Sequence, residues 1–303
     1  MKAIHLVKHG KASTAFLQKE IPIPVPAKNQ VLIKAEAFGL NFADVMARLG
    51  IYRDAPPIPS VLGYEVVGRI ENFGAEVNNF QKGQRVVAFT RFGAYAEYAV
   101  TDYRAAITIP EDMDIGIAAA LATQYCTAWF CAEEMVNLSE GNHVLVNAAA
   151  GGVGIALLQL AKRKNCIVYA NCGSDEKKSF LKNLSADYVF NYNKQDYFSE
   201  LKEKKIRMDV VFDSLGGKNF KKGYKLLAHG GRIVGYGAAE QVHSKKLFSS
   251  LSLLFGFGFY SPAFMLMQSK SIIGANMLRI ADSKPEVLQR CLQNVVKLAV
   301  KNE

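Results

Sequence analysis

A glycine-rich turn near the middle of the chain constrains the fold more than any other feature. Residues 143–154 read His-Val-Leu-Val-Asn-Ala-Ala-Ala-Gly-Gly-Val-Gly. The apolar run at residues 144–146, with two β-branched members, is typical of a buried strand. Apolar residues then recur at helical spacing over residues 155–161, and three basic residues follow in the last turn. The pattern therefore predicts a strand, a tight turn of small residues and a helix in succession.

A turn of this kind can bind the pyrophosphate group of a dinucleotide. Gly151 lets the backbone approach phosphate oxygens, and Gly152 and Val153 open a helix whose free N–H groups and positive dipole end attract anions. Gly154 lets the helix pack close to the strand. Ala149 stands where the G-x-G-x-x-G fingerprint has its first glycine, so the pattern is incomplete, and a tight turn that binds nothing would share it. The flanking strand and helix favour the nucleotide.

The chain changes character near residue 115. The part before it is β-rich, with strands predicted at residues 3–7, 31–35, 63–70 and 84–89 and a short helix at 41–49. After an alanine-rich helix at 117–131, strands alternate with helices, which predicts an α/β fold with a parallel, doubly wound sheet. Right-handed crossovers would place the strand ends at Asp213 and Gly235 beside the glycine turn. The later elements are predicted at residues 167–170, 176–184, 188–192, 210–213, 231–237, 271–274 and 285–300.

Composition narrows the classes of function. The 303 residues leave room for two domains. The net charge of +10 would suit a protein that binds nucleic acid or a membrane surface. Because the lysines are scattered, we expect no nucleic-acid partner and attribute the excess positive charge to the attraction of an anionic cofactor. The five cysteines are odd in number and lack C-x-x-C spacing, which indicates free thiols in a reducing compartment. No signal peptide precedes the first predicted strand, so we expect a cytoplasmic location.

Residues 247–269 contain no charged side chain. The stretch is long enough to span a membrane, but serines, glycines and one proline interrupt it. We therefore expect a flap or a hydrophobic wall beside the substrate rather than a membrane span. An amphipathic helix lying at a membrane interface is the alternative.

The order of the motifs resembles the medium-chain dehydrogenase/reductase superfamily. The resemblance covers nearly the whole chain and is closest to the zinc-free quinone oxidoreductase (zeta-crystallin-like) branch, near its vesicle amine transport protein-like subgroup. It rests on five motifs in this order: Asn41-Phe42-Ala43-Asp44, Pro56-Pro57-Ile58-Pro59-Ser60-Val61-Leu62-Gly63-Tyr64-Glu65, Ala149-Ala150-Gly151-Gly152-Val153-Gly154, Asn191-Tyr192 and Asp213-Ser214-Leu215-Gly216-Gly217.

This resemblance implies a domain organisation and an assembly. A GroES-like, β-rich catalytic domain would comprise residues 1–122 and 268–303, and a Rossmann nucleotide-binding domain would comprise residues 123–267, with an apolar insert at about 247–267. Members of the family usually continue for another strand, helix and strand beyond the helix that is predicted here at 285–300. The resemblance also implies a homodimer in which the edges of the two nucleotide-binding sheets are joined.

Two sets of zinc ligands known in related enzymes have no counterpart here. Zinc-dependent relatives carry a cysteine early in the first helix and a histidine in a Gly-His-Glu turn, and the corresponding places hold Asn41 and Tyr64. They also carry a four-cysteine lobe, but here Gly83-Gln84-Arg85-Val86 runs on directly to Gly93-Ala94-Tyr95. We therefore expect no metal, and Tyr64 would fill the space that the metal occupies in those relatives.

The expected cofactor is NADPH. Folds that prefer NAD place an acidic residue at the end of the second strand of this domain, whereas residues 171–174 read Asn-Cys-Gly-Ser. Ser174 and Lys177 could instead contact a ribose 2′-phosphate, although Lys177 could equally be an ordinary surface lysine. In similar quinone oxidoreductases the residues that match Lys177 and Tyr192 line the adenosine phosphate. Ser214 and Gly237, which follow the next two strands, complete the expected contacts with the cofactor.

The chemistry expected without metal is hydride transfer to an electron-poor acceptor. Alcohol oxidation needs a Lewis acid or a strong base, whereas a quinone or enone needs only a hydride donor and a group that polarises its oxygen. The resemblance places Asn41, Tyr52 and Thr127 near the nicotinamide. Asn41 could instead cap a helix, Tyr52 could pack a loop, and Thr127 could pack a helix.

The sequence thus predicts an NADPH-dependent, metal-free reductase of quinones or α,β-unsaturated carbonyls, with Asn41 and Tyr52 as its catalytic residues. The alternative is a nucleotide-binding adaptor with little or no catalysis, which would use the apolar insert to contact a membrane or another protein.

Overall fold

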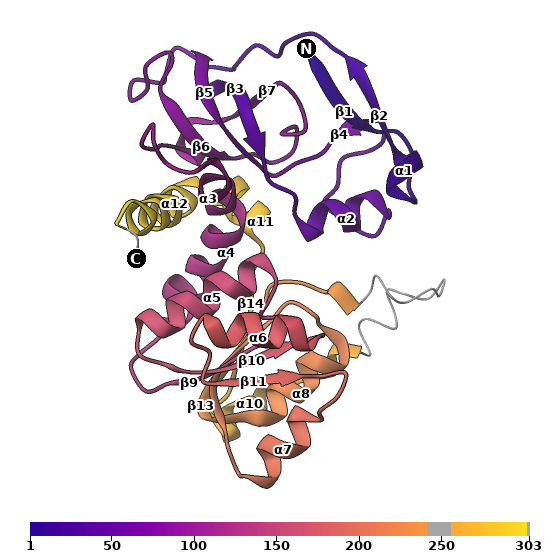
Figure 1. Cartoon of the computed structure of the whole chain (residues 1–303), viewed down its shortest axis with the longest axis vertical. Helices are drawn as coiled ribbons and strands as arrows, with labels where there is room; N and C mark the ends of the chain where they lie inside the picture. Colours follow the sequence, from indigo (N-terminus) through magenta and orange to yellow (C-terminus); the bar gives the residue numbers. More distant parts are fainter. Residues whose placement is uncertain (241–255, 302–303) are drawn as a thin grey trace. The chain divides into compact units, whose positions relative to one another are not determined.

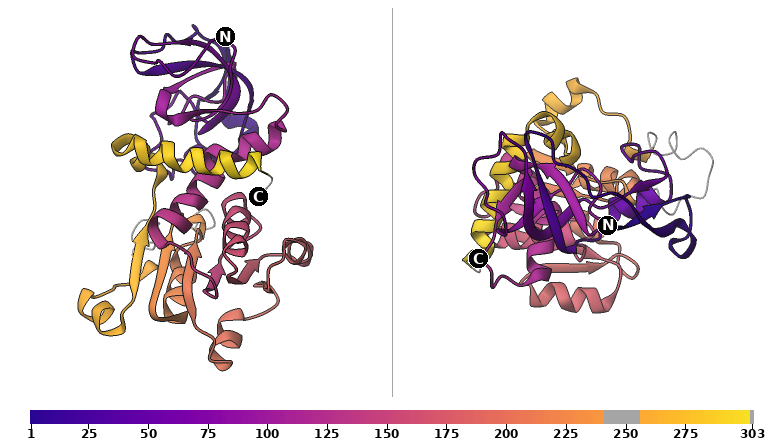
Figure 2. Two further views of the ribbon diagram at one scale, coloured as in Figure 1. Left: turned by 90° about the vertical axis from the view of Figure 1, so that its left-hand side faces the viewer. Right: turned by 90° about the horizontal axis from the view of Figure 1, so that it is seen from above.

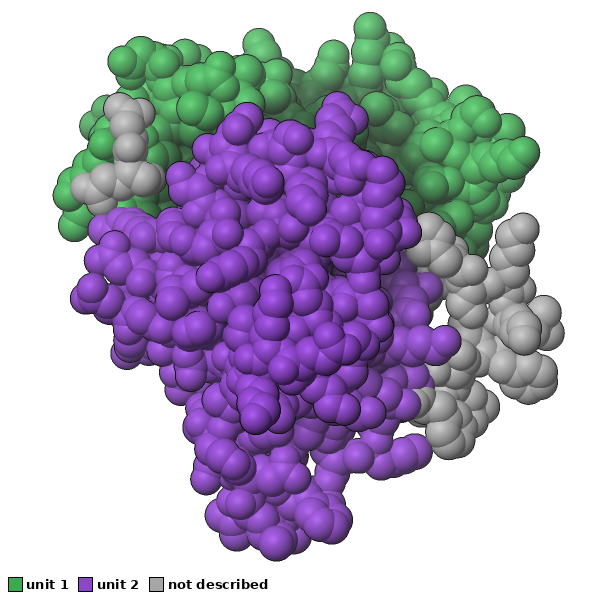
Figure 3. Space-filling view, turned by 60° about the horizontal axis from the view of Figure 1, so that its bottom comes forward, with its two compact units in different colours: residues 1–126, 277–303 green, residues 127–276 purple. Residues whose placement is uncertain are grey.

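The computed structural model describes residues 1–240 and 256–301, and it divides the chain into two compact units. Unit 1 comprises Met1–Cys126 and Met277–Glu303, and unit 2 comprises Thr127–Asn276 (Figure 3). Each unit has its own sheets and its own core.

Unit 1 is built on two antiparallel sheets (Figure 1). The smaller has the order β2-β1-β4, and the larger has the order β7-β3-β5-β6-β8. The strands are β1 (Lys2–Leu6), β2 (Phe16–Glu20), β3 (Gln30–Phe38), β4 (Ser60–Val61), β5 (Glu65–Phe73), β6 (Arg85–Phe89), β7 (Tyr98–Asp102) and β8 (Ala106–Thr108). The helices are α1 (Ala12–Ala15), α2 (Phe42–Arg48), η1 (Tyr103–Ala105), α3 (Ile115–Ala120), η2 (Leu121–Tyr125), α11 (Met277–Ser283) and α12 (Pro285–Val300).

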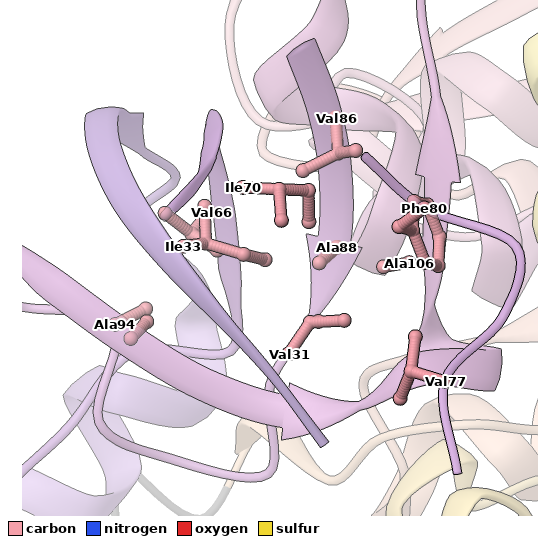
Figure 4. Close-up of a cluster of buried hydrophobic side chains, with 11 residues drawn as sticks. Val31, Ile33, Val66, Ile70, Val77, Phe80, Val86, Ala88, Ala94 and Ala106 are labelled. Atoms are coloured by element: carbon pink, nitrogen blue, oxygen red, sulfur yellow. The ribbon is translucent and has the colours of Figure 1, made fainter. Parts of the chain in front are cut away.

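The core of unit 1 forms where the strands of the larger sheet curl around their apolar side chains. Alternate residues of β3 and β5 point into it, as the period of a strand requires. Figure 4 shows these side chains facing one another: Val31, Ile33, Val66, Ile70, Val77, Phe80, Val86, Ala88, Ala94 and Ala106. Helix α12 packs against η1, β8 and η2, and Figure 2 shows its full length.

Unit 2 is a six-stranded parallel sheet with the order β11-β10-β9-β12-β13-β14. Its strands are β9 (His143–Val146), β10 (Ile167–Cys172), β11 (Tyr188–Asn191), β12 (Met208–Asp213), β13 (Leu227–Gly235) and β14 (Ser271–Gly274). Its helices are α4 (Cys126–Trp129), which starts at the last residue of unit 1, η3 (Phe130–Val136), α5 (Gly152–Arg163), α6 (Asp175–Asn183), α7 (Tyr197–Glu203), α8 (Gly217–Leu226) and α10 (Pro262–Gln268).

This strand order confirms the predicted doubly wound α/β fold. From β9 the chain moves outward to β10 and β11, and then returns to the other side of β9 for β12, β13 and β14. The order reverses between β9 and β12, and such a switch point is where open α/β sheets bind dinucleotides, outside the carboxyl ends of the strands.

The point at which the chain returns to unit 1 differs from the prediction. The expected boundary at residue 268 assigned the strand at 271–274 to the first domain. In the structure β14 pairs in parallel with β13, from Arg232 opposite Ser271 to Gly235 opposite Gly274. Because the backbone groups of β14 are hydrogen-bonded in the parallel sheet, the strand belongs to unit 2, and unit 1 resumes at Met277.

Two apolar stretches bear on the membrane question. Within the described ranges, one helical run, Ile115–Val136, is long and apolar enough to cross a membrane. Several of its side chains are buried, including Leu121, Cys126 and Phe130, and a core helix of a soluble protein passes the same test. The predicted apolar insert lies partly outside the described residues. In its described part, Phe257 and Tyr260 pack against Phe220 of α8.

Candidate cofactor site

The two glycines of the central turn have different surroundings. Gly151 is the N-cap of α5, and a Cβ atom added there would meet only the carbonyl oxygen of Ala148, at 3.3 Å. A Cβ atom on Gly154 would lie 2.6 Å from that same oxygen and 2.7 Å from Cα of Ala149. Gly154 is therefore required for the helix to pack against the turn. Gly151 is much less crowded than Gly154 and lies at the start of the helix, where N–H groups lack partners within the helix.

The other predicted contacts gather at the same edge of the sheet. Parallel strands end at one edge, so the residues that follow β10, β11, β12 and β13 lie beside the turn that follows β9. Gly173 and Tyr192 touch, because a Cβ atom on Gly173 would lie 2.6 Å from the Tyr192 hydroxyl oxygen. In the same way, a Cβ atom on Gly237 would lie 2.7 Å from the backbone oxygen of Ser214, so these two residues touch. Thr127 lies on α4 rather than at a strand end, so the sheet topology does not bring it to this group.

A buried hydrogen-bonded chain fixes three of these strand ends. The Asn147 side chain donates to Asp213 Oδ1 at 2.9 Å, and the Asn171 side chain donates to Asn147 Oδ1 at 2.7 Å. Asp213 Oδ2 accepts from the backbone N–H of Gly216 at 2.8 Å. Burial raises the pKa of Asp213 to about 6. Such a network holds its members in one arrangement, which keeps the loops after β9, β10 and β12 in register.

The start of α6 has the features expected of a phosphate contact, but they also serve the helix. Ser174 is the N-cap, and its hydroxyl oxygen accepts a hydrogen bond from the backbone N–H of Lys177 at 3.2 Å. The Lys177 side chain is exposed. Asp175 accepts hydrogen bonds from Lys194 and from the Asn191 side chain, and the Lys194 contact lowers the pKa of Asp175. The negative charge nearest to Ser174 is therefore already paired.

In unit 1, Asn41 occupies the N-cap position of α2, and its side chain is used elsewhere. Its backbone N–H donates to Asp44 Oδ2 at 3.0 Å, which satisfies the helix start. Its side-chain Nδ2 donates to Glu65 Oε1 at 2.9 Å, and Glu65 Oε2 accepts from the backbone N–H of Thr123 at 2.8 Å. The Glu65 side chain is fully buried, and this burial raises its pKa to about 7.

Tyr52 and Tyr64 lie together in the same unit. Their rings meet edge to face at a centroid distance of 6.4 Å, and the Tyr64 ring packs against Phe92 at 5.2 Å. Tyr64 is buried and Tyr52 is half-buried. Burial raises the pKa of Tyr52 above its ordinary value, so its phenol stays protonated and can donate a hydrogen bond.

Comparison with known proteins places the chain in a family. Residues 152–293 match the model described as "Zinc-binding dehydrogenase", and residues 27–111 match "Alcohol dehydrogenase GroES-like domain". Mouse quinone oxidoreductase is 35% identical over 239 residues, which cover 77% of this chain and 72% of that protein. The chain belongs to the quinone oxidoreductase and VAT-1 branch of the medium-chain dehydrogenase/reductase superfamily. The resemblance stated from the motifs is thereby confirmed.

Two further relatives define the branch more closely. The rat synaptic vesicle membrane protein VAT-1 homolog is 32% identical over 301 residues, which cover 98% of this chain and 74% of that protein. The crystal structure of Escherichia coli quinone oxidoreductase complexed with NADPH superimposes with a TM-score of 0.83 at 25% identity, covering 99% of this chain and 89% of that one. The fold of this chain is thus that of a relative which binds NADPH.

The name of the matching zinc-binding model does not extend to the ligands of this chain. Among the residues that the structure describes, no three His, Cys, Asp or Glu side chains form a group that could hold a metal ion. The two positions assigned to zinc ligands in related enzymes hold Asn41, hydrogen-bonded to Glu65, and Tyr64, packed between aromatic rings. These side chains lack the thiolate and imidazole that zinc prefers.

Glu65, the last residue of the second motif, is a part of the site whose role the sequence pattern does not predict. One signal in the sequence points to it: a glutamate that opens the apolar strand run Glu65-Val66-Val67. Buried carboxylates are rare and require partners. The sequence alone does not supply the partners, because Asn41 and Thr123 lie 24 and 58 residues away.

Proposed function

We propose that this protein is an NADPH-dependent reductase of quinones or α,β-unsaturated carbonyls. The observation that carries the proposal is the gathering of the glycine turn, Ser174, Tyr192, Ser214 and Gly237 at the switch-point edge of the parallel sheet. The relatives named quinone oxidoreductase, one of them solved with NADPH, support the same reading.

The residues of unit 2 fit the dinucleotide by their chemistry. The N–H groups at the start of α5 would bind the pyrophosphate beside Gly151. Ser174 and Lys177 would bind the 2′-phosphate of the adenosine ribose, beside Tyr192. Asp175 opposes this phosphate little, because Lys194 pairs with it. When bound, NADPH supplies the hydride.

The residues of unit 1 supply hydrogen-bond donors. Asn41 has a second N–H besides the one that Glu65 accepts, and Tyr52 has a protonated phenol. Either group can polarise the oxygen of an acceptor and stabilise the negative charge that develops there during hydride transfer. A quinone or enone needs no more than this, so the reaction requires no Lewis acid.

The direct test measures NADPH oxidation at 340 nm with a panel of 1,2-quinones, 1,4-quinones and enones. We expect turnover with at least one acceptor, and faster turnover with NADPH than with NADH. Tight NADPH binding without turnover on the whole panel would reject the reductase and leave the nucleotide-binding assignment standing.

One observation favours the adaptor as a second candidate. Near α10, four large apolar side chains are strongly exposed: Phe259 at 82%, Phe264 at 63%, Leu266 at 81% and Met267 at 77%. Such a cluster is a candidate for contact with a membrane or another protein. Sedimentation with lipid vesicles, for the native chain and for a Phe259→Ser, Leu266→Ser variant, tests this candidate. Vesicle binding that both substitutions abolish, in a protein without turnover, would favour the adaptor.

A further inference from the structure

A buried carboxylate joins two segments of unit 1: the start of α2, which holds Asn41 of the candidate site, and the helical turn η2. Glu65, which is 0% exposed, accepts one hydrogen bond from the Asn41 side chain and one from the backbone of Thr123 in η2. The helix that begins in η2 continues into α4, which carries Thr127. Glu65 therefore holds α2 and η2 through one side chain. Burying a carboxylate is costly unless hydrogen bonds satisfy its oxygens, and Asn41 and Thr123 provide such bonds.

The backbone opposite Glu65 is shaped to hold it. A Cβ atom on Gly39 would lie 2.0 Å from Glu65 Oε1 and 2.6 Å from its Cδ. Any side chain at position 39 would displace the carboxylate from Asn41. The titratable groups that face Glu65 are Asp44 on α2, Tyr95 before β7 and Cys126 on α4. None of these three is a cation, so the partners of the carboxylate charge are the N–H groups of Asn41 and Thr123 and the Thr123 hydroxyl.

The protonation state of Glu65 determines which hydrogen bonds its carboxyl group can accept. An ionised carboxylate only accepts, and it can take the N–H groups of Asn41 and Thr123 together. A protonated carboxyl has an O–H that must donate, and one of the two oxygens then no longer accepts well. Burial raises the pKa of Glu65 to about 7, so both states are populated near neutral pH.

We propose that Glu65 is a positioning residue: in its ionised form it fixes the Asn41 amide, and its protonation releases that amide. This inference rests on the proposed function where it concerns catalysis, because Asn41 is the donor assigned there. The orientation of the amide is a property of unit 1 alone. Two measurements therefore separate the positioning role from the reaction itself.

The first measurement does not depend on turnover. The side-chain amide signals of Asn41 are followed by ¹H–¹⁵N NMR from pH 5.5 to 8.5, and the spectrum of Asn41→Ala identifies them. We expect these signals to move with a midpoint near 7 in the native chain and to stay flat in Glu65→Gln. Signals that stay flat in the native chain, or that move identically in Glu65→Gln, would overturn the proposal.

The second measurement is the pH profile of kcat with the best acceptor of the panel. In the native chain kcat should fall towards low pH, because protonation of Glu65 releases Asn41. In Glu65→Gln kcat should be about tenfold lower at pH 8 and independent of pH, because the catalytic donor is less well oriented. NADPH binding should stay within about twofold, because the proposed contacts with its pyrophosphate and 2′-phosphate lie in unit 2. Gly39→Ala should reproduce the defect, and Glu111→Gln, at an exposed carboxylate, should leave the profile intact.

If Glu65→Gln keeps both the native value of kcat and its native dependence on pH, the positioning role is refuted, even if the protein is a reductase. If the native chain reduces no acceptor, the proposed function fails, and the NMR titration alone decides whether Glu65 holds Asn41. If Gly39→Ala does not fold, both measurements on Glu65→Gln still test the proposal.

Discussion

The same substitution at two glycines of the central turn should have opposite consequences. A valine at position 154 places its Cβ atom 2.6–2.8 Å from backbone atoms of Ala148 and Ala149, which no side-chain rotation can move away. Overpacking of this kind typically costs about 1–3 kcal/mol. For a protein of this size we expect the melting temperature of Gly154→Val to fall by about 3–10 °C. A Cβ atom at position 151 has one tight contact, with the backbone oxygen of Ala148 at 3.3 Å, so the melting temperature of Gly151→Val should fall less than that of Gly154→Val.

Binding of NADPH should show the reverse sensitivity to position. A branched side chain at Gly151 fills the space into which we place the pyrophosphate. Hydrogen bonds to charged groups contribute about 1.5–3 kcal/mol each, so the loss of one or two should weaken NADPH binding by about tenfold or more. Calorimetric titration gives the dissociation constants, and circular dichroism gives the melting temperatures. Native affinity in Gly151→Val would show that the pyrophosphate lies elsewhere. A native melting temperature in Gly154→Val would show that the helix and turn do not approach as closely as described.

Four further predictions concern the cofactor, metal content, pH dependence and assembly. Lys177→Ala should weaken NADPH binding about tenfold and leave NADH binding nearly unchanged, with Lys182→Ala on the same helix as the control, and equal losses for both cofactors would make Lys177 an ordinary surface lysine. Elemental analysis should find no stoichiometric zinc, and a chelator should not reduce activity, whereas about one zinc per chain would contradict this. Burial raises the pKa of Asp213 from 3.8 to about 6, so the folded state holds this proton more tightly than the unfolded state and its stability falls as pH rises through that window. Between pH 4 and 8, the free energy of unfolding of Asp213→Asn, measured with urea, should therefore rise relative to that of the native chain by up to about 3 kcal/mol. A difference that stays constant with pH would count against the raised pKa of Asp213. Light scattering should give the mass of a homodimer, as proposed from the family, and a monomer mass would reject it.

The sequence alone determined that unit 2 is built on a parallel, doubly wound sheet, because this class of fold follows from local patterns and general rules. The strand, turn and helix around Gly151 are specified by residues that are neighbours in the chain. Right-handed crossovers then bring the successive strand ends to one edge. Tyr192, Ser214 and Gly237 could therefore be assigned to that edge without any knowledge of side-chain contacts. The helix at Pro285–Val300 was likewise predicted at its observed bounds, since its apolar residues recur with helical spacing.

Tertiary structure decided what the pattern left open. Two glycines that look alike in the sequence proved different, because only the fold shows which one is crowded by backbone and which one is much less so. The strand at Ser271–Gly274 was assigned to the first domain from the sequence, and its pairing with β13 places it in unit 2. Asn41 was predicted to be either a helix cap or a catalytic donor, and the structure shows it at the N-cap of α2 with its side-chain amide donating to Glu65. That contact joins residues far apart in the chain, and its form depends on the space left by Gly39. Local patterns encode backbone geometry, whereas the charge and partners of a buried side chain depend on segments that meet only when the chain has folded.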